Sequence, residues 1–273
     1  MYVVLGVILA VVGLLMVWFN ISYSPLKKQF EKDTKRLTAE NKLETGGEVF
    51  TEKDFEHLPS VIRRYIENSG YIGKEKMSYL KMEYRDVDFR TGQNGAKLKM
   101  DYTQYNFVKE PCRMALDDAS MFGVPFQGYD YYEDGKGGMK GVIAKLITLF
   151  DQTGEEMDKA CLVTFLAESL FVPTVLMQDY VTFEQTGEYE VKGTITYKGQ
   201  TVSGIFKFNE QYEMESFRTL DRKDDKTPWT AVCSDYEVSE SGIKVPTKFK
   251  AVWNYSDGDF VYFDGKISSI TYG

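Results

Sequence analysis

Histidine and cysteine are scarce in this 273-residue chain, and their scarcity limits the chemistry available to it. The single histidine is His57, so a Ser-His-Asp or Cys-His mechanism would have to use it as the base. It stands directly before Leu58-Pro59, at the expected start of a helix, where a capping or solvent-exposed role fits better. A zinc site needs several Cys or His ligands at fixed spacings, and the sequence has none. We therefore expect no catalytic histidine, no metal and no cofactor.

The three cysteines, Cys112, Cys161 and Cys233, lie far apart along the chain. An odd number of cysteines cannot all pair within one chain, and no CxxC motif is present for metal binding or redox work. Each cysteine is therefore interpreted as a small buried apolar side chain.

Signatures of nucleotide and nucleic-acid binding are also missing. Residues 135–141 are rich in glycine but have neither the Walker spacing nor the GxGxxG pattern, so we interpret them as a tight turn between a strand and a helix. The net charge of −8 and the pI near 5.0 indicate an acidic surface, which repels phosphate backbones. Nucleic acid is therefore not an expected partner.

Charge is absent from residues 2–26, which are mostly aliphatic or aromatic. A helix of about 20 residues spans a bilayer, so this run predicts a transmembrane anchor over residues 1–26 with the lipid bilayer as its partner. Trp18 and Tyr23 stand near its end, where aromatic rings prefer the headgroup level. The alternative, a cleaved signal peptide, fits less well, because no basic residue precedes the run and the sequence around Asn20 is a poor cleavage site.

The rest of the chain predicts an α+β domain. Aromatic residues make up 15% of the sequence, which favours strands and half-buried surfaces. Alternating apolar and charged residues, as in 80–84 and 97–102, predict a sheet with one dry and one wet face. Further strands are expected at 129–132 and repeatedly between 180 and 272, where short turns favour antiparallel pairing.

Helices are expected at 58–70, 142–150 and 155–170, from apolar residues at 3.6-residue spacing and from acidic residues at the start of the third. Pro59 suits the first turn of the first helix, and Gly70 suits its end. The expected organisation is a charged linker over residues 27–50 and one domain over residues 51–273. In this domain a large curved antiparallel sheet, a half-open β-barrel, wraps over a few helices.

Among the acidic residues, Glu168 stands out because it lies in the otherwise apolar stretch 165–173. A buried carboxylate must be paired, hydrogen-bonded or protonated. We favour a structural ion pair with Arg64 or Arg218 over a ligand contact. The adjacent acidic pairs, such as Asp117-Asp118, are interpreted as solvated turns or helix N-termini.

Several short motifs together resemble an uncharacterised bacterial family of membrane-anchored proteins over about residues 50–273. They are Leu58-Pro59, Arg64-Tyr65, Asp130-Tyr131, Leu166-Ala167-Glu168, Phe217-Arg218, Thr227-Pro228-Trp229 and Val245-Pro246. From these motifs we expect ligand contacts at Tyr65, Tyr131, Glu168, Arg218 and Trp229. The order of elements is also similar to that of the Lol-type lipoprotein carriers, whose half-open barrel holds acyl chains under a helical lid.

The likeness to these carriers implies a non-catalytic module that binds a lipid or another apolar ligand in a concave sheet. Two alternatives stay open, namely a structural or interaction protein of the cell envelope and a carboxylate-dependent hydrolase. The resemblance favours an extracytoplasmic domain on a single-pass protein of the cell membrane. Five basic residues directly after the apolar run, from Lys27 to Arg36, favour the cytoplasmic side instead.

Overall fold

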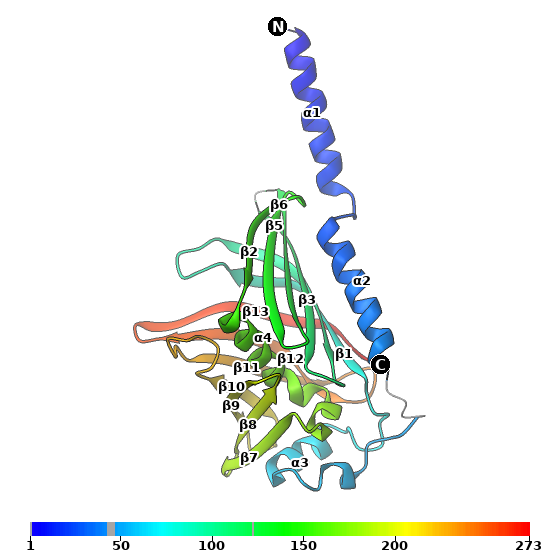
Figure 1. The fold of residues 1–273 in the computed structure, drawn as a ribbon, viewed down its shortest axis with the longest axis vertical. Helices are drawn as coiled ribbons and strands as arrows, with labels where there is room; N and C mark the ends of the chain where they lie inside the picture. The colour runs from blue at the N-terminus through cyan, green and yellow to red at the C-terminus, as the bar shows by residue number, and fades with distance from the viewer. Residues whose placement is uncertain (1, 43–46, 122) are drawn as a thin grey trace.

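The apolar N-terminal segment forms helix α1 (Tyr2–Asn20), which projects away from the rest of the chain at the top of Figure 1. None of the residues of α1 is buried, and the helix is long and apolar enough to cross a membrane. The computed structural model describes residues 2–42, 47–121 and 123–273.

The remaining elements follow in a simple order along the chain. The helices and 3₁₀ turns are α2 (Pro25–Glu40), η1 (Glu52–Phe55), α3 (Ser60–Asn68), α4 (Glu155–Glu168), η2 (Ser169–Phe171) and η3 (Pro173–Met177). The strands of the first half are β1 (Tyr79–Arg90), β2 (Lys97–Phe107), β3 (Cys112–Met121), β4 (Val124–Glu133), β5 (Lys136–Ile143) and β6 (Ile147–Thr153). Those of the second half are β7 (Val181–Gly187), β8 (Glu190–Tyr197), β9 (Gln200–Phe208), β10 (Met214–Thr219), β11 (Trp229–Val238), β12 (Lys244–Tyr255) and β13 (Gly258–Tyr272).

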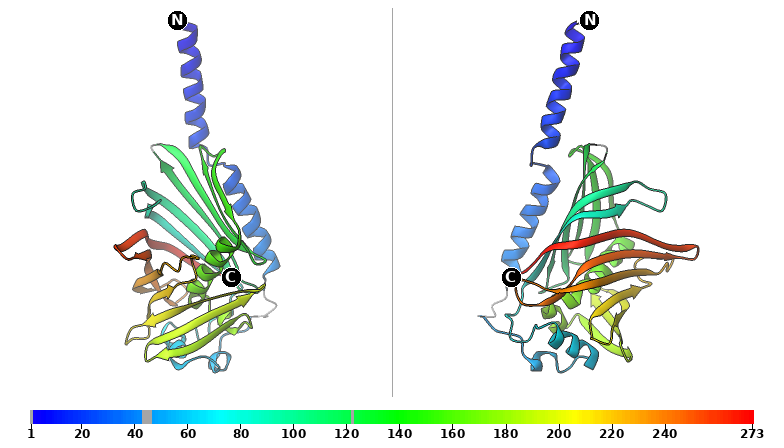
Figure 2. Two further views of the ribbon diagram at one scale, coloured as in Figure 1. Left: turned by 60° about the vertical axis from the view of Figure 1, so that its left-hand side comes forward. Right: turned by 180° about the vertical axis from the view of Figure 1, so that it is seen from behind.

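All these strands join one antiparallel sheet of 13 strands in the order β6-β5-β4-β3-β2-β1-β13-β12-β11-β10-β9-β8-β7. Two meanders therefore meet where β1 pairs with β13, and β6 and β7 are the free edges. Figure 2 shows that the sheet is strongly curved. Helix α4 lies inside the curve and contacts β3–β6 on one side and β8–β9 on the other. The prediction of a large curved antiparallel sheet around a few helices is confirmed.

Helix α2 covers the outer face of β2–β4. Pro25 occupies its first turn, and the Ser24 hydroxyl accepts a hydrogen bond from the Lys27 N–H at 3.1 Å, as expected of an N-cap. Its apolar side buries Leu26, Phe30 and Leu37 against β2, β3 and β4. Much of the segment predicted as a linker, residues 27–50, is thus a helix packed on the sheet, while residues 43–46 lie outside the described residues.

The helix predicted at 142–150 is wrong, because this segment forms the hairpin of β5 and β6. Short apolar runs fit helical and extended periods alike. Here the two halves of the run pair with each other at the edge of the sheet, which makes them strands. The glycine-rich segment 135–141 is also not a strand-to-helix turn, since most of it belongs to β5. Gly137 lies so close to α4 that an added Cβ would come within 2.9 Å of Cys161 Cβ. The glycines therefore let α4 pack directly on the strand.

The other expected helices are confirmed as α3 and α4. Gly70 follows α3 with a φ of +76°, a left-handed conformation that favours glycine. Pro59 occupies the position directly before α3, whose apolar residues are buried in the core cluster. His57 lies just before α3 and is exposed, and its Nε2 is 3.3 Å from the carbonyl oxygen of Leu176.

Candidate ligand-binding cavity

A cavity of about 870 Å³ lies between α4 and the concave face of the sheet. Its lining comes from β1–β6 on one side, from β11–β13 on the other, and from one side of α4. The two meanders and the helix that connects them therefore line it jointly.

One wall of the cavity is aromatic. It is lined by Phe89, Trp229, Phe249, Trp253, Tyr255, Phe260, Tyr262 and Phe263. Trp229 and Trp253 are register partners on β11 and β12, and the rings of Trp253 and Tyr262 stack with centroids 6.4 Å apart. The Trp229 Nε1–H donates a hydrogen bond to the Tyr262 hydroxyl at 3.0 Å. Because this polar atom is satisfied within the wall, the wall offers apolar ring surface to the cavity.

Two cations connect α4 with the aromatic wall. The Arg222 guanidinium lies 4.4 Å from the centroid of the Trp229 ring and donates to the carbonyl oxygen of Ala160 in α4 at 3.3 Å. Lys223 Nζ lies 5.0 Å from the centroid of the Trp253 ring. These cation–π contacts hold the loop between β10 and β11 across the cavity, so the loop and α4 together form its cover.

A hydrogen-bonded group of polar side chains, which we call the polar floor, lies between the sheet and the end of α4: Arg113, Glu168, Gln104 and Tyr102, which line the cavity, and Asn106 beside them. Arg113 Nε and Nη2 lie 3.0 and 3.3 Å from the two carboxylate oxygens of Glu168. Asn106 Nδ2 donates to Glu168 at 2.8 Å, and Asn106 Oδ1 accepts from Gln104 at 3.3 Å. Arg113 also donates to the Tyr102 hydroxyl. Each charge of the floor is thus paired and further hydrogen-bonded, as a buried charge requires.

The ion pair at the centre of the floor is nearly inaccessible, with side-chain exposures of 8% for Arg113 and 16% for Glu168. Burial acts to lower the pKa of Arg113, but the charges of Glu168 and other neighbours outweigh it and raise that pKa. The predicted ion pair of Glu168 therefore exists, with a different partner. Arg64 and Arg218 are both exposed, Arg64 over the Tyr212 ring, so neither reaches Glu168.

Two further carboxylates, Asp117 on β3 and Asp130 on β4, line the cavity beside the polar floor. Burial and then the charge of Asp130 raise the pKa of Asp117 to about 8, although Arg113 acts in the opposite direction. Burial also raises the pKa of Asp130. Asp130 Oδ1 is buried and has no hydrogen-bond partner within the described residues. Asp130 can therefore accept a hydrogen bond from a molecule in the cavity, and its charge favours the protonated form of Asp117.

The raised pKa of Asp117 predicts a pH dependence of stability. Its folded-state pKa is about 8, whereas an unfolded Asp has a pKa of about 3.9. The folded state therefore binds this proton more tightly, and the stability it contributes is full below pH ~4 and falls as the pH rises to about 8, by at most about 1.4 kcal/mol per pH unit. Thermal unfolding of the full chain in a mild detergent measures this dependence. Between pH 6 and pH 8 the stability of Asp117→Asn should fall less than that of the wild type.

Asp118→Asn provides the matched control, because Asp118 accepts a hydrogen bond from Gln127 at 3.2 Å on the neighbouring strand. This variant should keep the wild-type pH dependence. If Asp117→Asn also kept it, the carboxyl group of Asp117 would not be protonated in the folded protein at neutral pH.

The cavity brings together two of the five residues expected to contact a ligand, Glu168 and Trp229. The other three lie elsewhere. Tyr65 is fully buried in the core and donates to the carbonyl oxygen of Leu170 at 3.3 Å. Tyr131 packs beside Tyr129 in the cluster under α2, on the outer face of the sheet. Arg218 is exposed on β10.

The roles of Arg113, Asp117 and Asp130 were not predicted from the sequence. Asp117 was expected in a solvated turn or at a helix N-terminus, but it lies in β3 with its side chain in the cavity lining. A signal was present, because residues 112–117 alternate between apolar side chains and Arg113, Ala115 and Asp117. That alternation indicates a strand, and here its polar side faces inward because α2 covers the apolar side.

Cysteine and metal chemistry find little support at this cavity. Cys161 and Cys233 line it, and burial raises the pKa of the Cys161 thiol to about 12, so the reactive thiolate is disfavoured. Across the described ranges, 2–42, 47–121 and 123–273, no group of three or more His, Cys, Asp or Glu side chains is placed to hold a metal ion.

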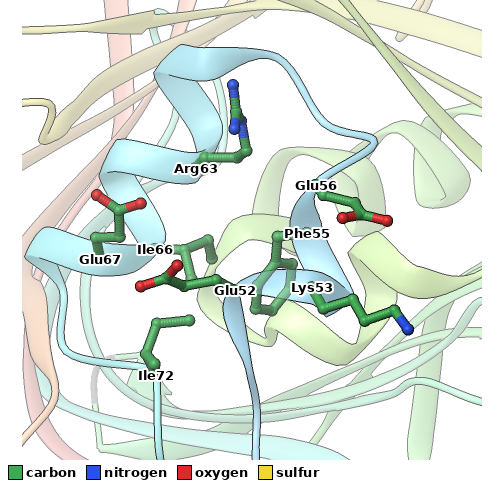
Figure 3. A pocket seen from close by; sticks show the side chains of 8 residues that line it. All are labelled: Glu52, Lys53, Phe55, Glu56, Arg63, Ile66, Glu67 and Ile72. Carbon is green, nitrogen blue, oxygen red and sulfur yellow. The ribbon is translucent and has the colours of Figure 1, made fainter.

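A second hollow of about 420 Å³ lies near α3 and η1, apart from the cavity (Figure 3). Figure 3 shows charged side chains around it, among them Glu52, Arg63 and Glu67. Phe55 and Ile66 also line it, and both belong to the buried core. This hollow has no apolar wall comparable to that of the cavity, so the cavity is the better candidate site.

Residues 48–265 match a protein family described as "Family of unknown function (DUF6544)". An uncharacterised family was expected from the motifs, and this expectation is confirmed. No curated protein matches the chain in sequence. Among solved structures, the chain is similar to the crystal structure of an outer membrane lipoprotein-sorting protein domain from Vibrio parahaemolyticus. The two share 8% identity with a TM-score of 0.46, over 78% of this chain and 90% of that chain. So distant a likeness says nothing about a ligand.

Proposed function

The chain belongs to the DUF6544 family, and from its own geometry we propose that it is a single-pass membrane protein whose domain binds a lipid or another apolar molecule in the cavity beneath α4. The observation that carries the proposal is the cavity of about 870 Å³ with an aromatic wall. Pockets for small molecules have volumes of roughly 300–1,000 Å³ and are mostly apolar with a few polar groups. Helix α1 would supply the anchor, since its 19 residues extend about 28 Å.

The polar residues indicate how such a ligand would be oriented. Its apolar part would lie against the aromatic wall, and its polar end would meet Asp117 and Asp130. The polar floor is already paired internally, whereas Asp130 Oδ1 is a buried acceptor without a partner among the described residues and Asp117 lines the cavity beside the floor. A ligand with hydroxyl or other donor groups would satisfy these carboxyl groups, whereas a carboxylate on the ligand would be repelled by them. We therefore propose a neutral amphiphile with hydrogen-bond donors as the ligand class.

Quenching of tryptophan fluorescence tests this proposal directly, because two of the three tryptophans, Trp229 and Trp253, line the cavity. The full chain carrying Trp18→Phe would be titrated in detergent with a monoacylglycerol whose acyl chain is brominated. Bound bromine close to the two rings should quench their emission, and the quenching should saturate near one equivalent. Emission that falls only in proportion to the probe in the micelle would contradict a binding cavity.

The proposed orientation is tested by the brominated fatty acid with the same acyl chain. Because its carboxylate would face Asp117 and Asp130, it should bind at least several-fold more weakly than the monoacylglycerol at pH 8. Equal affinity of the two probes would show that these carboxyl groups do not contact the polar end.

A carboxylate-dependent hydrolase is the second candidate, and one observation favours it. Asp117, Asp130 and Glu168 line one cavity, and a pKa of about 8 keeps Asp117 protonated at neutral pH, as a general acid requires. Mass spectrometry of the monoacylglycerol after incubation separates the two functions. A binding protein returns the probe intact, whereas a hydrolase releases the fatty acid and loses this activity in Asp117→Asn.

The third interpretation, a structural protein of the envelope, has less support. A packed interior would favour it, and the interior holds a cavity instead.

A further inference from the structure

Three large apolar side chains are exposed together at the tip of the β5–β6 hairpin. Leu146, Ile147 and Leu149 have exposures of 66%, 60% and 53%. Beyond the N-terminal segment, the other exposed large apolar side chains of the described residues are scattered singly, at Val49, Leu220, Val238 and Val261. Single exposed apolar residues are ordinary on protein surfaces, but a cluster at one tip indicates a contact surface.

The turn of this hairpin is bonded to the end of α1. The Trp18 Nε1–H donates to the carbonyl oxygen of Ala144 at 2.9 Å. In return, Lys145 Nζ donates to the carbonyl oxygens of Trp18 and Ile21 at 3.0 and 2.6 Å. These carbonyls at the C-terminal end of α1 have no partner within the helix, so a cation there satisfies them and complements the helix dipole.

The backbone conformation of the turn also indicates that the contact with α1 holds the turn in place. Ala144 and Lys145 have φ values of +54° and +66°, a left-handed conformation that is unfavourable for both and that Asn or Gly would adopt more easily. Lys145 is nevertheless only 5% exposed, because its side chain is held against α1. The contact with α1 thus compensates for an unfavourable turn.

The contact fixes the level of the tip relative to a membrane. If α1 spans the bilayer, as the proposed function states, Trp18 lies at the headgroup level, where tryptophan is favoured. The tip is bonded to Trp18 and so lies at the same level, as Figure 1 shows for β6 beside the junction of α1 and α2. Residues 141–150 carry no charge except Lys145, whose ammonium group donates hydrogen bonds to the carbonyl oxygens of Trp18 and Ile21. The one charged side chain of this segment is thus held against α1 and is not exposed at the tip.

We propose that the tip of the β5–β6 hairpin, residues 144–149, inserts Leu146, Ile147 and Leu149 into the interfacial region of the leaflet from which α1 emerges. The partner is the lipid bilayer itself. The same strand, β6, lines the cavity with Asp151 and Gln152. Insertion of the tip would therefore hold one rim of the cavity close to the lipids.

Quenching by brominated phospholipids tests the proposal with the full chain in phosphatidylcholine nanodiscs. Leu149→Trp places a reporter at an exposed position of the tip, and Ile147→Trp is a second variant in case the first perturbs the hairpin. The control is Val238→Trp, at a position that is 69% exposed. Val238 pairs with Lys244, whose N–H donates to the carbonyl oxygen of Ser69 directly after α3, and α3 lies at the end of the domain away from α1 (Figure 1). After subtraction of the wild-type signal, we expect at least twofold stronger quenching of the tip reporters than of the control.

The native Trp18 separates failure of this proposal from failure of the anchor. Quenching of Trp18 without quenching of either tip reporter would overturn the insertion of the hairpin and leave the anchor intact. If Trp18 itself escaped quenching, both the anchor and the insertion would be wrong. Ligand binding in the cavity is measured separately and does not enter either result.

Discussion

Replacing Arg113 with methionine is expected to lower the stability of the domain by about 3–5 kcal/mol, because it leaves the carboxylate of Glu168 buried without its cation. Both side chains are largely buried, at 8% and 16% exposure, so solvent can replace the paired guanidinium only in part. For a domain of this size the loss corresponds to a decrease in Tm of roughly 6–20 °C. Thermal unfolding of the full chain in detergent, followed by circular dichroism, measures it.

The double variant Arg113→Met with Glu168→Met is the control. Removing both charges avoids an unpaired buried ion, so most of the lost stability should return. Glu168→Gln alone should also destabilise the domain, since it leaves Arg113 without its counter-charge. If the free energy of unfolding of either single variant lay within about 1 kcal/mol of the wild-type value, the ion pair of the polar floor would not be a buried structural unit.

Filling the cavity is expected to reduce ligand affinity at least tenfold, or about 1.4 kcal/mol. Ala231 and Ala251 are register partners on β11 and β12, and both line the cavity between the aromatic rings. Phenylalanine at both positions would occupy space that the ligand needs. The measurement is the titration of the double variant with brominated monoacylglycerol in the Trp18→Phe background.

Ser234→Phe is the matched control for this experiment, because Ser234 lies on the same strand and is exposed outside the cavity. It should leave the affinity unchanged. The expected melting temperature of the filled variant is close to that of the wild type, since the new rings enter existing space. Undiminished affinity in a correctly folded filled variant would place the ligand elsewhere.

Much of the fold could be predicted from alternation and turn chemistry. Strands with alternating side chains, such as β1 and β2, and the helices α3, which Gly70 follows, and α4, with its acidic first turn, all follow local rules. The β5–β6 hairpin did not, because its apolar residues fit a helical period and its turn, Ala144-Lys145, lacks the Asn or Gly of a favoured hairpin turn. The turn conformation depends on a contact with α1, more than 120 residues away in sequence.

The candidate site was harder to predict for a related reason. Alternation indicates two faces of a strand but not which face is covered. In β3 the polar side faces the cavity because α2 covers the apolar side. The sequence alone therefore did not predict that Arg113 and Asp117 line a cavity. Glu168 was found because a lone carboxylate in an apolar helix must have a partner, but its partner depends on which strand lies opposite. Tyr65 and Tyr131 belong to motifs that the structure places in packed clusters.

The geometry combines three features that are useful together to a lipid-binding protein. The cavity has an aromatic wall, the carboxyl groups of Asp117 and Asp130 lie in its lining, and α1 is long and apolar enough to cross a membrane. The proposed insertion of the hairpin tip would shorten the path between the bilayer and the cavity.

Native mass spectrometry of the full chain, released from detergent in the gas phase, tests the central claim most directly. The account predicts a protein that carries one additional mass corresponding to a neutral amphiphile of its membrane, and it predicts that the variant with Ala231→Phe and Ala251→Phe lacks this mass. A wild-type chain that is repeatedly observed without any bound molecule, or a filled variant that carries the same mass, would contradict it.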